Sequence, residues 1–233
     1  MSAAVLHGRD CTAYGIVQRA EHGGWAISLC RGFESPAPKQ DPNEDSCGVT
    51  TTPSGTVAVV ADAHFGRRSA EVAVDVLLSA AQTGPPGRDP IGWMKARLSE
   101  LNQQLQPGSS ACALLMVVAQ GDRLFWASIG DCRLYRLRSA QTVVLNRLNE
   151  RYLGDRGWLR VTTGEGTLQK GDRVIMVSDG VPECRYGIPT LTPQQIGQIT
   201  AQGSAAEAAR ALVAAALQGG GEDNIAVALL SHG

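Results

Sequence analysis

Residues 57–68 of the chain read VAVVADAHFGRR. The apolar run at residues 57–60 predicts a strand that is buried on both faces, because a half-exposed strand would alternate polar and apolar residues. The run meets a carboxylate at Asp62, and His64 follows after Ala63. A single aspartate at a strand end is commonly a turn former. The question is therefore whether other strands end in the same way.

The same pattern recurs along the chain. Carboxylates flank the apolar runs FWASI, RVIMVS and IAVALL and the segment at residues 47–51, and with Asp62 the set is Glu44, Asp45, Asp62, Asp131, Asp179 and Asp223. A β-sandwich can gather several strand ends on one side. Carboxylates brought that close repel one another, and their pKa values rise unless a cation compensates. An all-oxygen cluster without paired histidines or cysteines favours Mg²⁺ or Mn²⁺ over Zn²⁺.

The order of the expected elements favours one α+β domain over residues 1–233. Helices are expected at 67–82, at 91–105 after the N-cap Asp89, after Thr192, and at 205–218 behind a Ser204–Glu207 capping box. Strands are expected at 12–19, 24–30, 56–61, 111–119, 123–129, 133–138, 142–146, 173–178 and 224–230. Short connections predict antiparallel neighbours. The predicted architecture is two antiparallel sheets packed as a sandwich, with helices on the outside.

Composition excludes several classes of function. The 21 basic and 22 acidic residues give a net charge of −1, so nothing points to nucleic acid. No apolar run approaches the roughly 20 residues of a membrane span, and the first ten residues do not resemble a signal peptide. Six cysteines without a C-x-x-C pair indicate free thiols in a reducing compartment. We expect a cytoplasmic monomer with no membrane or nucleic-acid partner.

Six motifs carry a family resemblance. NED (43–45), ADAHFG (61–66), GSSA (108–111), IGDCRLY (129–135), GDRVIMVSDG (171–180) and EDNIAV (222–227) resemble, in that order, the motifs of the type 2C metal-dependent serine/threonine protein phosphatases, the PPM family. Singly these motifs are short, but their order along roughly residues 40–230 is specific. The family fold is a central antiparallel β-sandwich flanked by helices, which agrees with the element order.

The resemblance implies a metal centre with two ions, Mn²⁺ or Mg²⁺. Asp45 and Asp62 would hold the centre, with Asp62 bridging the ions, and Ala63 would offer its backbone carbonyl. Asp179 and Asp223 would complete the second ion's ligands. Asp131, together with Asp179, would match a weaker third-metal site of bacterial members.

The resemblance also implies two catalytic residues. Glu44 would act on the metal-bound water that attacks phosphorus, and His64 lies where some members place a general acid for the leaving alkoxide. Taken alone, Glu44 is equally a solvated loop residue, and His64 is more often a capped or surface histidine.

The chain departs from the family at the phosphate-binding arginine, because Gln40 stands in its place beside Lys39. Lys39 could substitute for the arginine or be a solvated loop charge. Arg67 and Arg68 could supply a phosphate contact, or they could form the solvated first turn of a helix. The sequence DAHFG also lacks two glycines of the family's DGHGG.

The leading hypothesis is a phosphatase for phosphoserine and phosphothreonine in proteins, with a serine/threonine kinase as its counterpart. A catalytically weak or inactive member that binds phosphoproteins is the alternative, favoured by the missing arginine. A phosphatase for small phosphoesters is a third reading, since no peptide-binding surface can be identified in the sequence.

Overall fold

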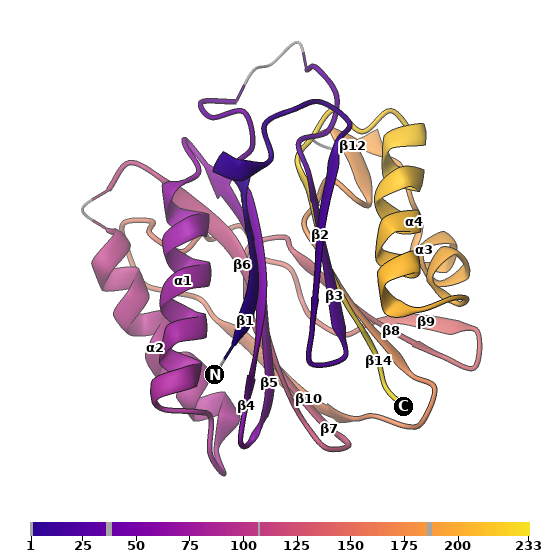
Figure 1. The fold of residues 1–233 in the computed structure, drawn as a ribbon. Helices are drawn as coiled ribbons and strands as arrows, with labels where there is room; N and C mark the ends of the chain where they lie inside the picture. Colours follow the sequence, from indigo (N-terminus) through magenta and orange to yellow (C-terminus); the bar gives the residue numbers. More distant parts are fainter. Residues whose placement is uncertain (1, 36–38, 107, 186–187) are drawn as a thin grey trace.

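Two antiparallel sheets pack face to face, and helices cover both outer faces (Figure 1). The computed structural model describes residues 2–35, 39–106, 108–185 and 188–233. Helices α1 (Arg68–Thr83) and α2 (Pro90–Leu105) lie on one sheet, and α3 (Pro193–Thr200) and α4 (Ala205–Gln218) lie on the other. The expected fold class, a helix-flanked antiparallel sandwich, is confirmed.

Each large sheet has six strands. In spatial order, the first contains β1 (Ala3–His7), β4 (Asp45–Thr52), β5 (Gly55–His64), β6 (Ala111–Gln120), β7 (Arg123–Ile129) and β10 (Thr162–Thr167). The second contains β2 (Val17–His22), β3 (Trp25–Cys30), β14 (Ile225–Ser231), β11 (Arg173–Val177), β8 (Arg133–Arg138) and β9 (Gln141–Val144). A short ribbon pairs β12 (Glu183–Arg185) with β13 (Ile188–Pro189), and a 3₁₀ turn, η1, spans Gly8–Asp10.

Strand β5 is buried on both faces, as its unbroken apolar run predicts. Ala58 and Val60 belong to the core between the sheets, whereas Val57 and Val59 pack under α1 and α2. A third apolar core fills the space between the second sheet and α4. A strand in the middle of such a stack is held on both sides, which makes it a rigid support for the residues at its end.

The sequence prediction is wrong about where β5 ends. The strand continues to His64, so Asp62 lies inside the strand and not after it. The neighbouring strands supply the reason: Asp45, the first residue of β4, pairs with Asp62, and β6 pairs with β5 as far as His64, which lies opposite Ala111. Backbone pairing therefore extends the strand past the point at which side-chain polarity changes.

The expectation that short connections join neighbouring strands is wrong between β7 and β8. Strand β7 belongs to the first sheet and β8 to the second, so residues 130–132 cross between the sheets. Gly130 makes this crossing in a left-handed conformation, with φ of 83°, which glycine adopts without a side-chain penalty. The crossing places Asp131 at the seam between the two sheets.

Other differences lie in poorly patterned segments. The first strand of the second sheet begins at Val17 and not at residue 12, and β1, β10, β12 and β13 were not expected. The helix ends agree better: Asp89 caps α2 by accepting from the Gly92 N–H at 2.9 Å, and Ser204 and Glu207 form the expected capping box. The sequence also predicts that Pro107 and Gly108 end the helix at 91–105; α2 ends at Leu105, and Pro107 lies outside the described residues.

All six cysteines are free thiols, and five of them are buried, with Cys184 partly exposed. No helix within the described part of the chain is both long and apolar enough to cross a membrane.

Candidate metal centre

The core of the site is a pair of aspartates on adjacent strands. Asp45 and Asp62 are register partners on β4 and β5, and both are buried. Asp179 follows β11 in the other sheet, and its carboxyl group lies close enough to Asp62 for the Asp62 carboxylate to raise the pKa of Asp179. The site therefore lies at the seam of the sandwich and joins strand ends from both sheets.

Ser178 fixes the geometry of this seam. Its hydroxyl donates to Asp45 Oδ2 at 2.7 Å and accepts from the Ala226 backbone N–H at 2.9 Å. One buried side chain thus ties β4 to the residues around β11 and β14. Sequence reasoning passed over Ser178, although its place directly before Asp179 was a usable signal.

Burial raises the pKa values of the carboxyl groups. Burial is the largest cause for Asp45, whose pKa rises to about 7, and neighbouring aspartates add to it while Lys39 and Ser178 oppose it. The pKa values of Asp62 and Asp179 rise well above the usual range, first through burial and then through nearby carboxylates. Asp131 shifts in the same direction, again chiefly through burial.

A pH dependence of stability follows from Asp45. Its folded pKa of about 7 lies above the unfolded value of about 3.9, so it stabilises the fold fully below pH 4 and loses this contribution as pH rises towards 7. We expect the melting temperature in a chelator to fall between pH 5 and pH 7.5, and to fall less in Asp45→Asn. A melting temperature that rises over this range in both proteins would contradict the arrangement.

The donor set fits a hard divalent cation. One carboxylate oxygen each of Asp45, Asp62 and Asp131 is buried without a hydrogen-bond partner among the described residues. An unsatisfied buried acceptor costs about 1–3 kcal/mol, and more when it is charged. Mg²⁺ and Mn²⁺ prefer such oxygen ligands. A cation bound here would satisfy several of these atoms at once.

The carboxylates do not yet converge on one point. No three acidic, histidine or cysteine side chains form a closed ligand group within the described ranges. Asp223, which precedes β14, is engaged elsewhere: Lys39 Nζ lies 2.6 Å from Asp223 Oδ1. Mutual repulsion of the carboxylates and this ion pair are physical reasons for an open arrangement.

Lys39 is neither a solvated loop charge nor a free substitute for the phosphate-binding arginine, which were the two expectations for it. Its side chain is only 26% exposed, so it is not a solvated loop charge. Burial would lower the pKa of Lys39, but the charges of Asp62, Asp223 and Asp45 outweigh burial and raise the pKa above its usual range. The ammonium therefore acts as an internal counter-ion of the acidic cluster, and it does not stand free to hold a phosphate.

Glu44 is buried next to the cluster and is held by backbone groups. Its Oε1 accepts from the Gly66 N–H at 2.8 Å and from the Asp41 N–H at 3.1 Å. Its own N–H donates to Asn224 Oδ1 at 2.8 Å, and Asn224 in turn donates to the Arg31 carbonyl. Glu44 and Asn224 thus fasten the loop before β4 to the turn after β5 and to β14. The role of Asn224 was not expected.

His64 and Ala63 occupy the end of β5. The His64 ring stacks edge-on against Tyr152, with centroids 4.4 Å apart. Burial lowers the pKa of His64, although the nearby Asp131 charge works in the opposite direction, and Nε2 has no partner among the described residues. Ala63 is fully buried and lies opposite Cys112 of β6.

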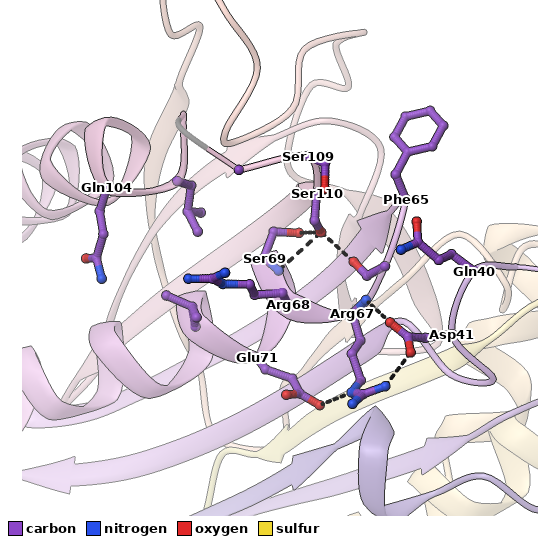
Figure 2. A pocket seen from close by; sticks show the side chains of 14 residues that line it. Gln40, Asp41, Phe65, Arg67, Arg68, Ser69, Glu71, Gln104, Ser109 and Ser110 are labelled. Atoms are coloured by element: carbon purple, nitrogen blue, oxygen red, sulfur yellow. Dashed lines mark hydrogen bonds and ion pairs between the residues drawn. The ribbon is translucent and has the colours of Figure 1, made fainter.

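The remaining candidates surround a pocket shown in Figure 2. Gln40 lies at its rim. Arg67 is committed to Asp41, through a side-chain ion pair and through its backbone N–H at 2.9 Å. Arg68 is exposed at the start of α1 and makes no ion pair with any described residue. Of the two arginines, only Arg68 is therefore available to a ligand.

Comparisons with known proteins agree with this fold. A family model described as Stage II sporulation protein E (SpoIIE) matches residues 66–232. The serine/threonine phosphatase PstP/Ppp of Mycobacterium tuberculosis has a TM-score of 0.72 at 22% identity over 89% of this chain and 97% of that one. A second structure of PstP holds two manganese ions. No curated protein sequence gives a significant match.

Two further structures have the same architecture. The serine/threonine phosphatase of S. agalactiae has a TM-score of 0.73 at 19% identity and covers 90% of this chain and 100% of its own. A bacterial serine phosphatase has a TM-score of 0.80 at 14% identity, with 91% and 98% covered. The sequence resemblance to PPM-type phosphatases is confirmed at the level of the fold.

Proposed function

The chain belongs to the family described as Stage II sporulation protein E (SpoIIE), and from this premise we propose that it removes phosphate from phosphoserine or phosphothreonine in proteins. The observation that carries the proposal is the acidic cluster at the seam, where Asp45, Asp62 and Asp179 meet from both sheets and where Asp45 and Asp62 each keep a buried oxygen without a partner among the described residues. A serine/threonine kinase that makes the substrate is the proposed counterpart in the cell.

The metal ions would be held by Asp45, Asp62, Asp179 and Asp223, with Ala63 contributing its backbone carbonyl and Asp131 a weaker third position. Two bound divalent cations would attract the phosphate and lower the pKa of the attacking water. The Glu44 carboxylate is fixed by two backbone N–H groups beside the cluster, which orients it to accept a proton there. His64 lies on the side of Asp131 and would give a proton to the leaving oxygen.

A phosphatase assay with and without Mn²⁺ tests this proposal. Turnover of a phosphothreonine peptide that requires Mn²⁺ or Mg²⁺ and stops with a chelator is expected. Turnover of p-nitrophenyl phosphate without turnover of any phosphopeptide would instead indicate a small-ester phosphatase.

The second candidate, a phosphoprotein-binding module with little activity, is favoured by one observation. The Lys39 ammonium is bound to Asp223, which the phosphatase needs as a ligand. Binding of phosphopeptides without turnover of either substrate, at any Mn²⁺ concentration, would select this candidate.

Lys39 gives a prediction about metal affinity. A divalent cation must displace the Lys39 ammonium from Asp223, so removal of this competitor in Lys39→Ala should tighten Mn²⁺ binding. Loss of one competing contact of about 1.4 kcal/mol corresponds to roughly tenfold in Kd. Titration calorimetry on metal-free protein measures the effect directly, without reliance on activity.

Lys39→Arg is the matched control, because it retains the positive charge and should leave the Mn²⁺ affinity near that of the wild type. Without metal, Lys39→Ala should melt at a lower temperature, since the carboxylates lose their counter-ion. Weaker Mn²⁺ binding in Lys39→Ala would show that Lys39 supports the metal centre and does not compete with it.

A further inference from the structure

A pocket of about 820 Å³ opens at the start of α1 (Figure 2). Three segments far apart in sequence form it: the loop at residues 40–41, the turn and first helical residues at 65–72, and the end of α2 with residues 108–110. The volume suits a few amino-acid residues rather than a single small ion. None of the proposed metal ligands lines this pocket, so metal binding does not account for it.

The pocket is directly joined to the candidate site. Gly66 lines the pocket, and its N–H donates to Glu44 Oε1 at 2.8 Å. Asp41, which also lines the pocket, donates its N–H to the same oxygen at 3.1 Å. Only the Glu44 side chain would therefore separate a polypeptide in the pocket from the acidic cluster.

The floor of the pocket is built from buried hydrogen bonds. Ser110 Oγ bonds to Ser69 Oγ at 2.7 Å, accepts from the Ser69 N–H at 3.2 Å, and donates to the Gly66 carbonyl. Both serines are buried. These bonds connect the turn after β5 to the start of β6, so the shape of the pocket exists before a ligand arrives.

Among the charged side chains that line the pocket, one cation is left without an ion pair in the described structure. Arg67 pairs with Asp41 and lies 3.3 Å from Glu71, and Glu71 is also bound by Arg9 at 2.6 Å. These pairs neutralise both acidic residues of the wall. Arg68 has no ion pair among the described residues, and Figure 2 shows its side chain extending away from this cluster on the side of Gln104. The pocket is thus complementary to a negative charge.

Phe65 marks the mouth of the pocket. It is 71% exposed and has a φ of 62°, a left-handed conformation that residues other than glycine rarely adopt. The backbone here is held by the Gly66 bonds to Glu44 and Ser110. An exposed aromatic ring beside a pocket with one unpaired cation is well placed to pack against a bound chain.

We propose that this pocket binds the stretch of substrate protein that flanks the phosphorylated residue, and that Arg68 selects an acidic side chain in that stretch. The inference rests on the proposed phosphatase function and adds its substrate class: phosphoproteins with Asp or Glu near the phosphorylated serine or threonine. Arg68 would be a specificity residue, since it contacts the flank and not the reacting phosphate.

The test compares kcat/KM for phosphothreonine peptides that carry either glutamates or lysines on both sides of the phosphorylated residue. The wild type should prefer the acidic peptide. In Arg68→Glu the ratio of acidic to basic kcat/KM should fall by at least about tenfold, through KM, because a favourable contact becomes a repulsive one. Arg68→Lys should retain most of the preference.

Arg88→Glu is the matched control. Arg88 is also exposed and without an ion pair in the described structure, but it lies beyond the other end of α1 and does not line the pocket. This control should leave the ratio unchanged. An equal fall of the ratio in both variants would reduce the effect to overall charge and overturn the proposal.

Failure of the pocket and failure of the phosphatase function are distinguishable. Turnover of p-nitrophenyl phosphate and of both peptides, with the same ratio in the wild type and Arg68→Glu, overturns the pocket and leaves the phosphatase intact. If no substrate is turned over, the same peptides are compared by fluorescence anisotropy. Binding that prefers the acidic peptide and loses this preference in Arg68→Glu supports the pocket, and binding without preference overturns it.

Discussion

Replacement of Asp62 by asparagine is expected to abolish phosphopeptide turnover, by about a thousandfold or more. Asp62 is buried between Asp45 on β4 and Asp179 beyond β11, so it would hold metal at the centre of the acidic cluster. Metal ions supply several kcal/mol of transition-state stabilisation. Since each 1.36 kcal/mol is a factor of ten in rate, loss of about 4 kcal/mol gives the stated factor.

The fold should survive this change. Burial and the Asp45 charge already raise the pKa of Asp62, so a neutral amide of similar size removes a repulsion and fills the same space. The metal-free melting temperature of Asp62→Asn should therefore equal or exceed that of the wild type. Asp122→Asn, at a side chain that is 82% exposed, is the control and should retain full activity. Near wild-type turnover in Asp62→Asn would remove the proposed metal centre.

His64→Ala should lower kcat on phosphothreonine peptides by about 10²–10⁴, the usual contribution of general acid catalysis, while p-nitrophenyl phosphate is affected far less. An alkoxide leaves slowly unless it receives a proton, whereas nitrophenolate leaves without one. His64 is half-buried beside Tyr152, and its Nε2 has no hydrogen-bond partner in the described part of the chain. From this position a proton can be given to a bound ester.

Steady-state kinetics on both substrates, with Mn²⁺ held constant, measures this difference. Tyr152→Phe is a useful control, because it keeps an aromatic ring against His64 and should leave the ratio between the substrates unchanged. Equal losses on the two substrates in His64→Ala would show that His64 maintains structure, and that it is not the proton donor.

The sandwich was predictable because its signals are local. The apolar run at residues 57–60 indicated a doubly covered strand, and the caps at Asp89 and Ser204 indicated helix starts; each depends on a few neighbouring residues. Strand β10, with the sequence TTGEGT, has no apolar pattern and is held by pairing with β7. Pairing between distant segments leaves no trace in either segment alone.

In the candidate site, too, local sequence features were predictable and contacts between distant residues were not. The recurrence of aspartates at strand ends could be read from the sequence, but the pairing of Lys39 with Asp223 could not, because it joins residues 184 positions apart. The crossing at residues 130–132 was also missed, since a three-residue connection normally joins neighbours in one sheet. That crossing places Asp131 at the seam.

Which of Arg67 and Arg68 is free to contact a ligand also depends on contacts between residues that are distant in sequence. Adjacent in sequence, they differ because Asp41 and Glu71 surround one of them and not the other. Both were equal candidates for a ligand contact until their neighbours were known.

A crystal structure of the protein grown with Mn²⁺, with anomalous diffraction at the manganese edge, is the most direct test of the proposed metal centre. We expect two anomalous peaks a few ångströms apart, bounded by Asp45, Asp62, Asp179 and Asp223, with the Lys39 ammonium moved away from Asp223. Crystals at saturating Mn²⁺ without a peak between these carboxylates, and with Lys39 still bound to Asp223, would contradict it.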